Sequence, residues 1–171
     1  MWSETIPASE FNPYYKTYID LVSETSIPKA LSLGMEEVAA FFESLPHEKW
    51  QYRYAPNKWT PKDILQHIAD TERVFAYRAL YFSRYPNADL KGFDENIFAE
   101  NAMANEKSVA TLLENYKAVR AATLSLFSNF NDDQSIRMGR ANGSDMSVRA
   151  AGVIIRGHEI HHCRIIKERY L

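Results

Sequence analysis

A helix-start signal followed by a long helical repeat is the feature that most constrains the fold. Thr60 can cap a helix, Pro61 suits its first turn, and Asp63 can return a hydrogen bond as in a capping box. A helix is therefore expected over residues 61–84. The residues at intervals of three and four that would face the interior, called the seam of the helix below, are Ile64, His67, Thr71, Val74 with Phe75, and Arg78. His67 thus occupies an inward position otherwise suited to an apolar residue.

Three further segments repeat apolar residues at intervals of three and four, as amphipathic helices do. They span residues 27–45, 106–129 and 146–169. Thr25 and Ser26 can cap the first of these helices, and Ser144 or Asp145 can cap the last. The sequence shows no strand alternation and no internal repeat.

The expected architecture is therefore all-α: a four-helix bundle with an N-terminal arm and a long crossing between helices two and three. Residues 1–26 form the arm, which is expected to pack on the bundle. Residues 86–105 form the crossing, in which Pro86 ends the second helix. A crossing of this length is uncommon unless it serves a site.

Composition limits the setting in which the chain works. Its 171 residues, 46% hydrophobic and 25% charged, suit a single domain over residues 1–171. The net charge is −2 and the basic residues are scattered, so nucleic acid is not expected as a partner. Residues 1–4 lack the basic flank and the apolar stretch of a signal peptide, and charges interrupt every candidate membrane span, so no membrane partner is expected. One cysteine, Cys163, fits a reducing compartment, and the predicted location is cytoplasmic.

Three histidines are the candidate metal ligands. The last helix has a seam of three-four steps that includes His158 and His162, which therefore face the bundle interior, while His161 lies out of register. Histidines four apart share one helical face, and the inward His67 could supply a third nitrogen to the same ion. Burying three imidazoles costs free energy unless each finds a partner, and a shared metal satisfies all three. Histidine-rich coordination favours zinc or nickel, with copper, iron and manganese as further options.

Two other kinds of metal site are possible alternatives. His158, Glu159 and His162 also spell the zinc-protease signature, with Glu159 as general base. The extended signature needs a third histidine where Glu168 stands, and Glu159 is turned about a hundred degrees from the seam. We therefore expect Glu159 to be a surface carboxylate or one that supports a metal ligand. A di-iron site needs inward glutamates from several helices, and the seams lack them.

Several other side chains have both a functional and a structural interpretation. Cys163 could be a nucleophile, although a buried cysteine is more often a packing residue. Arg73, Arg78 and Arg84 could hold an anionic substrate, and Arg78 is the strongest of them because it lies on the seam. An interhelical ion pair is the structural alternative for Arg78. Tyr116 could offer a hydroxyl to the cavity or belong to the core.

The chain resembles the DinB/YfiT-like superfamily of small metal-binding four-helix bundles over nearly its whole length. The stretches that carry the resemblance are residues 58–67, 70–80, 92–94 and 157–162. The resemblance implies a divalent metal held by one histidine of the second helix and two of the last. These map onto His67, His158 and His162.

The resemblance implies one of the activities assigned to relatives in this superfamily. One is that of a thiol S-transferase, which joins a low-molecular-weight thiol such as bacillithiol to an electrophile, and the other is that of a mycothiol-dependent maleylpyruvate isomerase. A metal-dependent hydrolase that uses metal-bound water and a non-catalytic metal or small-molecule binding stress protein are the alternatives. In each case the expected partner is a small molecule. The resemblance also implies a homodimer, for which Trp2, Phe11, Tyr14 and Tyr15 offer exposed aromatic surface.

Overall fold

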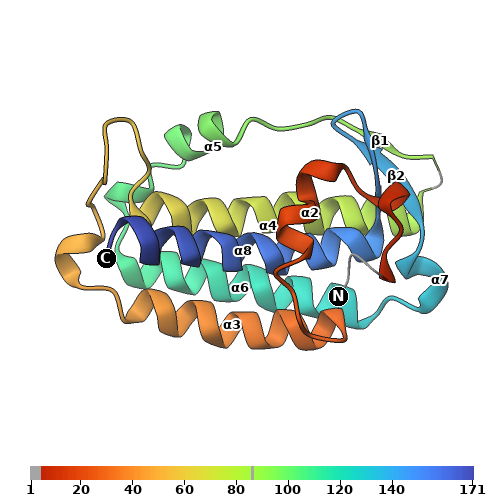
Figure 1. Cartoon of the computed structure of the whole chain (residues 1–171), viewed down its shortest axis with the longest axis horizontal. Helices are drawn as coiled ribbons and strands as arrows, with labels where there is room; N and C mark the ends of the chain where they lie inside the picture. The colour runs from red at the N-terminus through yellow and green to blue at the C-terminus, as the bar shows by residue number, and fades with distance from the viewer. Residues whose placement is uncertain (1–4, 86) are drawn as a thin grey trace.

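Four long helices form the body of the computed structural model, which describes residues 5–85 and 87–171 (Figure 1). They are α3 (Ile27–Glu43), α4 (Pro61–Arg84), α6 (Val109–Ser128) and α8 (Val148–Arg169). Helices α3 and α4 each pack against both α6 and α8. The predicted four-helix bundle is confirmed. Trp2, expected at a subunit contact, and Pro86, expected to end the second helix, lie outside the described residues.

Polar caps set where these helices begin. The Thr60 hydroxyl accepts a hydrogen bond from the Asp63 backbone N–H at 3.1 Å, and the Asp63 carboxylate accepts one from the Thr60 N–H at 2.9 Å. This is the predicted capping box, with Pro61 in the first turn. Ser26 caps α3, also as predicted.

A small sheet closes one end of the bundle, which corrects the expectation that the chain has no strands. Its strands are β1 (Asp89–Leu90), β2 (Met138–Ala141) and β3 (Ser144–Ser147), with β1 parallel and β3 antiparallel to β2. Asn142 and Gly143, with φ of 53° and 74°, make the two-residue turn that joins β2 and β3. Strands this short show no recognisable alternation in the sequence.

The β3 strand also moves the start of the last helix. Because β3 uses the residues expected to cap and begin that helix, α8 starts at Val148 instead of 146. Ser147 is its cap, with its hydroxyl 3.0 Å from the Ala150 N–H, so the prediction of Ser144 or Asp145 was wrong.

Short helical segments lie over the bundle. The N-terminal ones are η1 (Ala8–Glu10), η2 (Pro13–Tyr15) and α2 (Lys16–Ile19), and the others are η3 (His47–Lys49), α5 (Glu95–Asn101), η4 (Ala104–Glu106) and α7 (Asp132–Ser135). Helix α2 packs across α8 (Figure 1). Phe11 is only 6% exposed and packs in the core, so its expected role as an exposed aromatic was wrong, whereas Tyr14 is 65% exposed. The homodimer stays a prediction.

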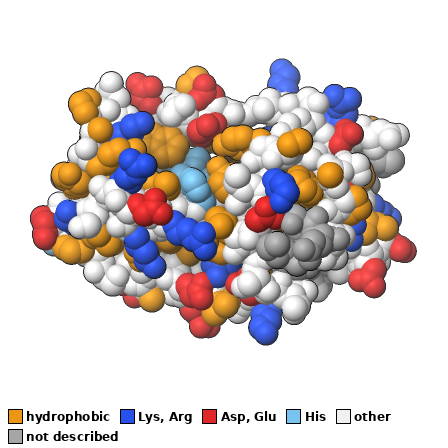
Figure 2. Space-filling model, in the orientation of Figure 1, with side chains coloured by type: hydrophobic (Ala, Val, Ile, Leu, Met, Phe, Trp, Pro, Cys, Tyr) orange, Lys and Arg blue, Asp and Glu red, His pale blue; other side chains and the backbone are white. Residues whose placement is uncertain are grey.

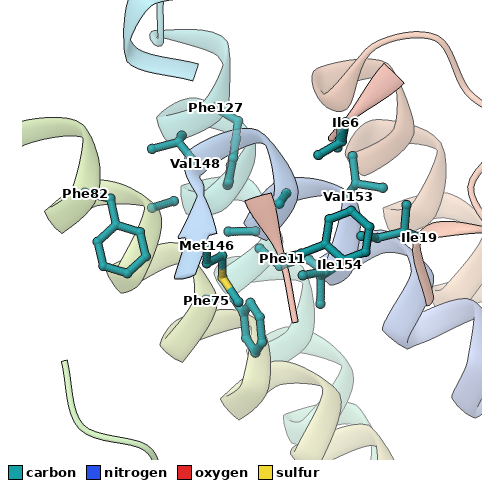
Figure 3. Close-up of a cluster of buried hydrophobic side chains, with 14 of the residues drawn as sticks. Ile6, Phe11, Ile19, Phe75, Phe82, Phe127, Met146, Val148, Val153 and Ile154 are labelled. Atoms are coloured by element: carbon teal, nitrogen blue, oxygen red, sulfur yellow. The ribbon is translucent and has the colours of Figure 1, made fainter. Parts of the chain in front are cut away.

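The apolar core has two parts. One contains the side chains of Figure 3, among them Phe11, Phe75, Phe82, Phe127, Met146 and Ile154. The other contains Phe42, Trp50, Leu65, Leu112, Tyr116 and Ile166. Along each long helix, residues of the first part occupy one half and residues of the second part the other.

A buried ion network lies where these two parts meet. The Arg120 guanidinium of α6 donates to Glu72 of α4 at 2.8 Å and to Glu159 of α8 at 2.6 Å. It also donates to the Leu31 carbonyl of α3 at 3.0 Å, so one side chain joins all four long helices. Burial alone would lower the pKa of Arg120, but the charges of Glu159 and Glu72 raise it well above its ordinary value.

Glu159 receives further partners in the same network. The Arg156 guanidinium donates to it at 3.0 Å, and the Tyr116 hydroxyl lies 2.9 Å from it. Because the Glu159 side chain has no exposed surface, the expectation of a surface carboxylate was wrong. Tyr116 belongs to the core, the second of its two interpretations.

Within the described ranges, no helix is long and apolar enough to cross a membrane.

Substituting Arg120 with methionine should destabilise the fold strongly. The change keeps most of the stem but leaves two buried carboxylates without their shared cation, and breaking a buried pair costs about 3–5 kcal/mol. Urea unfolding followed by circular dichroism measures the loss. The matched control is Lys117→Met on the same helix. Lys117 forms a salt bridge with Glu43 in which both side chains are exposed, and such a bridge stabilises the fold by about 1 kcal/mol or less. Equal losses in the two variants would contradict a stabilising role for the network.

Candidate metal centre

The structure brings three of the five histidines to one point between α4 and α8. The His67 Nε2 atom lies 3.0 Å from His158 Nε2, which in turn lies 3.0 Å from His162 Nε2. One nitrogen from each ring falls within 4.8 Å of the other two. A tetrahedral zinc site with Zn–N bonds of about 2.0–2.1 Å places its nitrogens roughly 3.3 Å apart. The cluster therefore fits a single ion between the three rings.

The surroundings keep these imidazoles neutral, which is the form that binds metal. His67 and His158 are each only 7% exposed. Burial lowers the pKa of His67 to about 4. Burial, together with the neighbouring histidines, lowers the pKa of both His158 and His162 well below the ordinary value.

Aromatic side chains fix the orientation of the rings. The Trp59 ring lies 4.5 Å from the His67 ring, between their centroids, and the Tyr18 ring meets His158 edge-on at 5.5 Å. The Thr71 hydroxyl lies 3.5 Å from His67 Nδ1, at the long limit of a hydrogen bond. His161 is half-buried, stands against Tyr18 with ring centroids 5.2 Å apart, and is not part of the cluster, as its register predicted.

The three histidines line a cavity of about 520 Å³, within the range of small-molecule sites. Figure 2 shows histidine side chains at the bottom of a hollow in the surface. The other lining residues are Asn12, Tyr14, Tyr15, Tyr18, Trp59, Thr71, Phe75, Arg78, Phe93, Glu95, Ala141, Asn142, Ser144 and Ile154. The cavity is therefore bounded by the two ligand-bearing helices, the N-terminal segments, the crossing and the β2–β3 turn.

A glycine beside His158 lets the N-terminal segment reach this cavity. A Cβ atom on Gly157 would lie 2.0 Å from the backbone oxygen of Tyr18, so a larger residue there would push α2 away from α8. Glycine in a helix interior costs about 0.5–1 kcal/mol relative to alanine. At this position it permits the contact that sets Tyr18 against His158.

The other predicted site residues are divided between the cavity and the rest of the molecule. Arg78 lines the cavity and is 3% exposed, and no ion pair involves it within the described ranges. Arg73 instead pairs with Asp70 at 3.0 Å, and Arg84 lies over the Phe130 ring. Arg78 therefore forms no interhelical ion pair with any residue that the structure describes.

Cys163 and Glu159 both lie outside the cavity lining. Cys163 packs against the second part of the core, and burial raises the pKa of its thiol to about 12. The Glu159 carboxylate faces Arg120 and Arg156, so the general-base role that the protease signature assigns to it has no geometric support.

Sequence reasoning missed the aromatic and polar walls of the cavity. Tyr15 and Tyr18 belong to the short helices η2 and α2, and Phe93 lies in the crossing. The spacing within such short segments does not show which side chains face the bundle interior. The Pro13 and Gly92 positions indicate that these segments turn, but they do not indicate where the segments dock.

Comparison with known proteins supports this description. The model of the DinB superfamily matches residues 30–166. No curated protein sequence matches the chain. Among solved structures the chain is similar to YfiT from Bacillus subtilis, which is described as a probable metal-dependent hydrolase with an unusual four-helix bundle topology. The two chains share 18% identity with a TM-score of 0.74, over 95% of this chain and 93% of that one, and this likeness establishes the fold. With its family match, its fold and its cluster of three histidines, the chain belongs to the DinB superfamily.

Proposed function

We propose that the chain is a metal-dependent enzyme of the thiol S-transferase type, which joins a low-molecular-weight thiol such as bacillithiol to an electrophilic small molecule. The proposed ligands are His67, His158 and His162, and the proposed ion is zinc or nickel. The convergence of the three neutral imidazoles supports this ligand set. The cavity above them supports a small-molecule substrate.

One observation carries the choice of reaction: the described residues that line the cavity include no activated nucleophile. The single cysteine, Cys163, lies outside the cavity, and its raised pKa keeps it protonated at neutral pH. Among the described residues the only carboxylate that lines the cavity is Glu95. The attacking group is therefore expected to enter with the reactants.

The protein residues would position the reactants and limit the access of water. When bound, a divalent ion at the histidines supplies a Lewis acid that lowers the pKa of a thiol or water. The Trp59 ring lies against His67 and the Tyr18 ring against His158, so each ring would cover part of one ligand from water. In the reaction the thiolate sulfur forms a bond to the electrophilic carbon, the leaving group departs with the bonding electron pair, and the thiol proton passes to solvent.

Hydrolysis is the second candidate. The description of YfiT as a probable metal-dependent hydrolase favours it. Glu95 could accept a proton from an attacking water, since its side chain lines the same cavity.

Metal binding should depend on the three clustered histidines and not on their neighbour. In protein purified without a histidine tag, we expect about one equivalent of zinc or nickel by elemental analysis. His158→Ala should weaken binding by more than about 100-fold, which is the upper range for losing a residue that only supports a ligand. His161→Ala, with the same substitution on the same helix, is the control and should keep its metal. Equal loss in both variants, or no metal in the wild-type protein, would refute the assignment.

Turnover should require both a thiol and the metal. We expect metal-loaded protein, given a panel of low-molecular-weight thiols and an alkylating electrophile, to form thioether faster than His158→Ala does. Cys163→Ala should retain the wild-type rate because the reacting sulfur belongs to the cosubstrate. Mass spectrometry of the product measures both.

The other outcomes separate the alternatives. Product release without any thiol would favour hydrolysis. Absence of turnover with every substrate class, together with a large fall in melting temperature on chelation, would favour a binding protein in which the ion ties α4 to α8.

A further inference from the structure

Of the three most deeply buried arginines, two pair with carboxylates and the third, Arg78, does not. Arg120 and Arg156, which are 0% and 4% exposed, each pair with at least two carboxylates. Arg78 is 3% exposed, yet no carboxylate oxygen of the described residues lies within 4 Å of it. An interior guanidinium remains charged, and a buried charge without a counter-ion is costly. Arg78 is the exception among them, and it is the one that lines the cavity.

The groups around Arg78 leave it available to a ligand. Its guanidinium carbon lies 4.9 Å from the centre of the Phe75 ring and 5.9 Å from that of Phe93, in cation–π contact. The Tyr15 hydroxyl also interacts with it, and burial lowers the pKa of Arg78. All three aromatic residues line the cavity with it. Ring faces satisfy only part of a guanidinium, whose planar fork of N–H donors matches a carboxylate.

The position of Arg78 relative to the histidines follows from helix geometry. Arg78 lies eleven residues after His67 on α4, which is about three turns and places both on one face, roughly 16 Å apart along the axis. Thr71 and Phe75 line the cavity between them. Arg78 and the histidines therefore lie at two ends of one cavity, separated along α4 by about three helical turns.

We infer that Arg78 is the anion-binding end of the cavity, and that the ligand is an elongated small molecule with a carboxylate at that end and an aromatic or planar apolar middle against Phe75 and Phe93. Its reacting group would lie at the histidines. Only this last element rests on the proposed function. The anion site itself stands on the burial of Arg78 and on its surroundings.

A matched pair of probes tests the inference: 3-phenylpropionate and its neutral amide, 3-phenylpropionamide. Ligand-observed NMR titration gives the Kd of each. We expect the wild-type protein to bind the acid at least about 10-fold more tightly than the amide, which is a modest value for a charge-assisted Arg–carboxylate contact. The preference should persist after chelation, because Arg78 and not the metal holds the carboxylate.

Three substitutions locate the effect. Arg78→Gln should bring the acid-to-amide ratio close to one and leave the affinity for the amide nearly unchanged. Arg78→Lys, which keeps the charge but not the fork, should give an intermediate ratio and remains informative if the glutamine variant does not fold. Arg73→Gln, on the exposed side of the same helix, should retain the wild-type ratio. Thermal melting checks that each variant is folded.

Each result separates this inference from the proposed function. Equal binding of acid and amide by the wild-type protein, or an undiminished preference in Arg78→Gln, would overturn the inference. A preference that disappears on chelation would also overturn it, while supporting a bound metal. A preference that persists in protein shown to bind no metal would uphold the anion site and refute the proposed function.

Discussion

The guanidinium of Arg120 is the contact on which the rest of the structure depends. It is the one described side chain whose hydrogen bonds join α6 to each of α3, α4 and α8. Taking charges out of water costs several kcal/mol for each ion, and the interior recovers that cost only where every donor and acceptor is satisfied. The backbone contributes to this, because a Cβ atom on Gly34 would lie 2.0 Å from a Glu159 oxygen. The close approach of α3 to α8 at Gly34 and the hydrogen bonds of the Arg120 network therefore depend on each other.

This network also fixes the rotation of the two helices that carry the histidines. Glu159 follows His158 directly, so the two side chains point about 100° apart around α8. Glu72 lies five residues after His67, which is about 140° around α4. Each helix thus presents one face to Arg120 and another to the cavity. Arg120 forms two hydrogen bonds with each carboxylate, and paired hydrogen bonds of this kind are directional. Holding Glu72 and Glu159 in place therefore also holds the two histidine-bearing faces toward each other.

Helical periodicity was sufficient to predict the bundle and the histidine cluster, because both depend on which residues share a face. His67, His158 and His162 lie at seam positions, and the structure brings them together. The same rule failed for Glu159, which was expected at the surface, and gave no indication that Glu72 and Arg120 are buried, since a charged residue in a sequence is ordinarily placed at the surface. Their burial depends on mutual pairing across three helices, which no single helix reveals.

Elements without a long repeat were predicted least well. The three strands hold two or four residues each, so the sheet had no alternation to detect, and its turn was visible only as Asn142 and Gly143. The N-terminal segment was expected to pack on the bundle, but its spacing did not show that Phe11 enters the core or that Tyr15 faces the cavity.

The cavity is consequently built by two kinds of structure with different constraints. The bundle supplies the histidines and Arg78, whose positions follow from helix register and from the ion network. The N-terminal segment supplies Tyr15 and Tyr18, whose positions depend on the close approach that Gly157 permits. Changes in the N-terminal segment therefore act on the cavity walls and on the His158 ring that Tyr18 contacts, whereas changes at Arg120 or Gly34 act on every helix together. The part of the site that could hold a metal is thus tied to the stability of the fold, and so is the wall formed by Phe75 and Arg78, whereas the tyrosine wall depends on how the N-terminal segment docks.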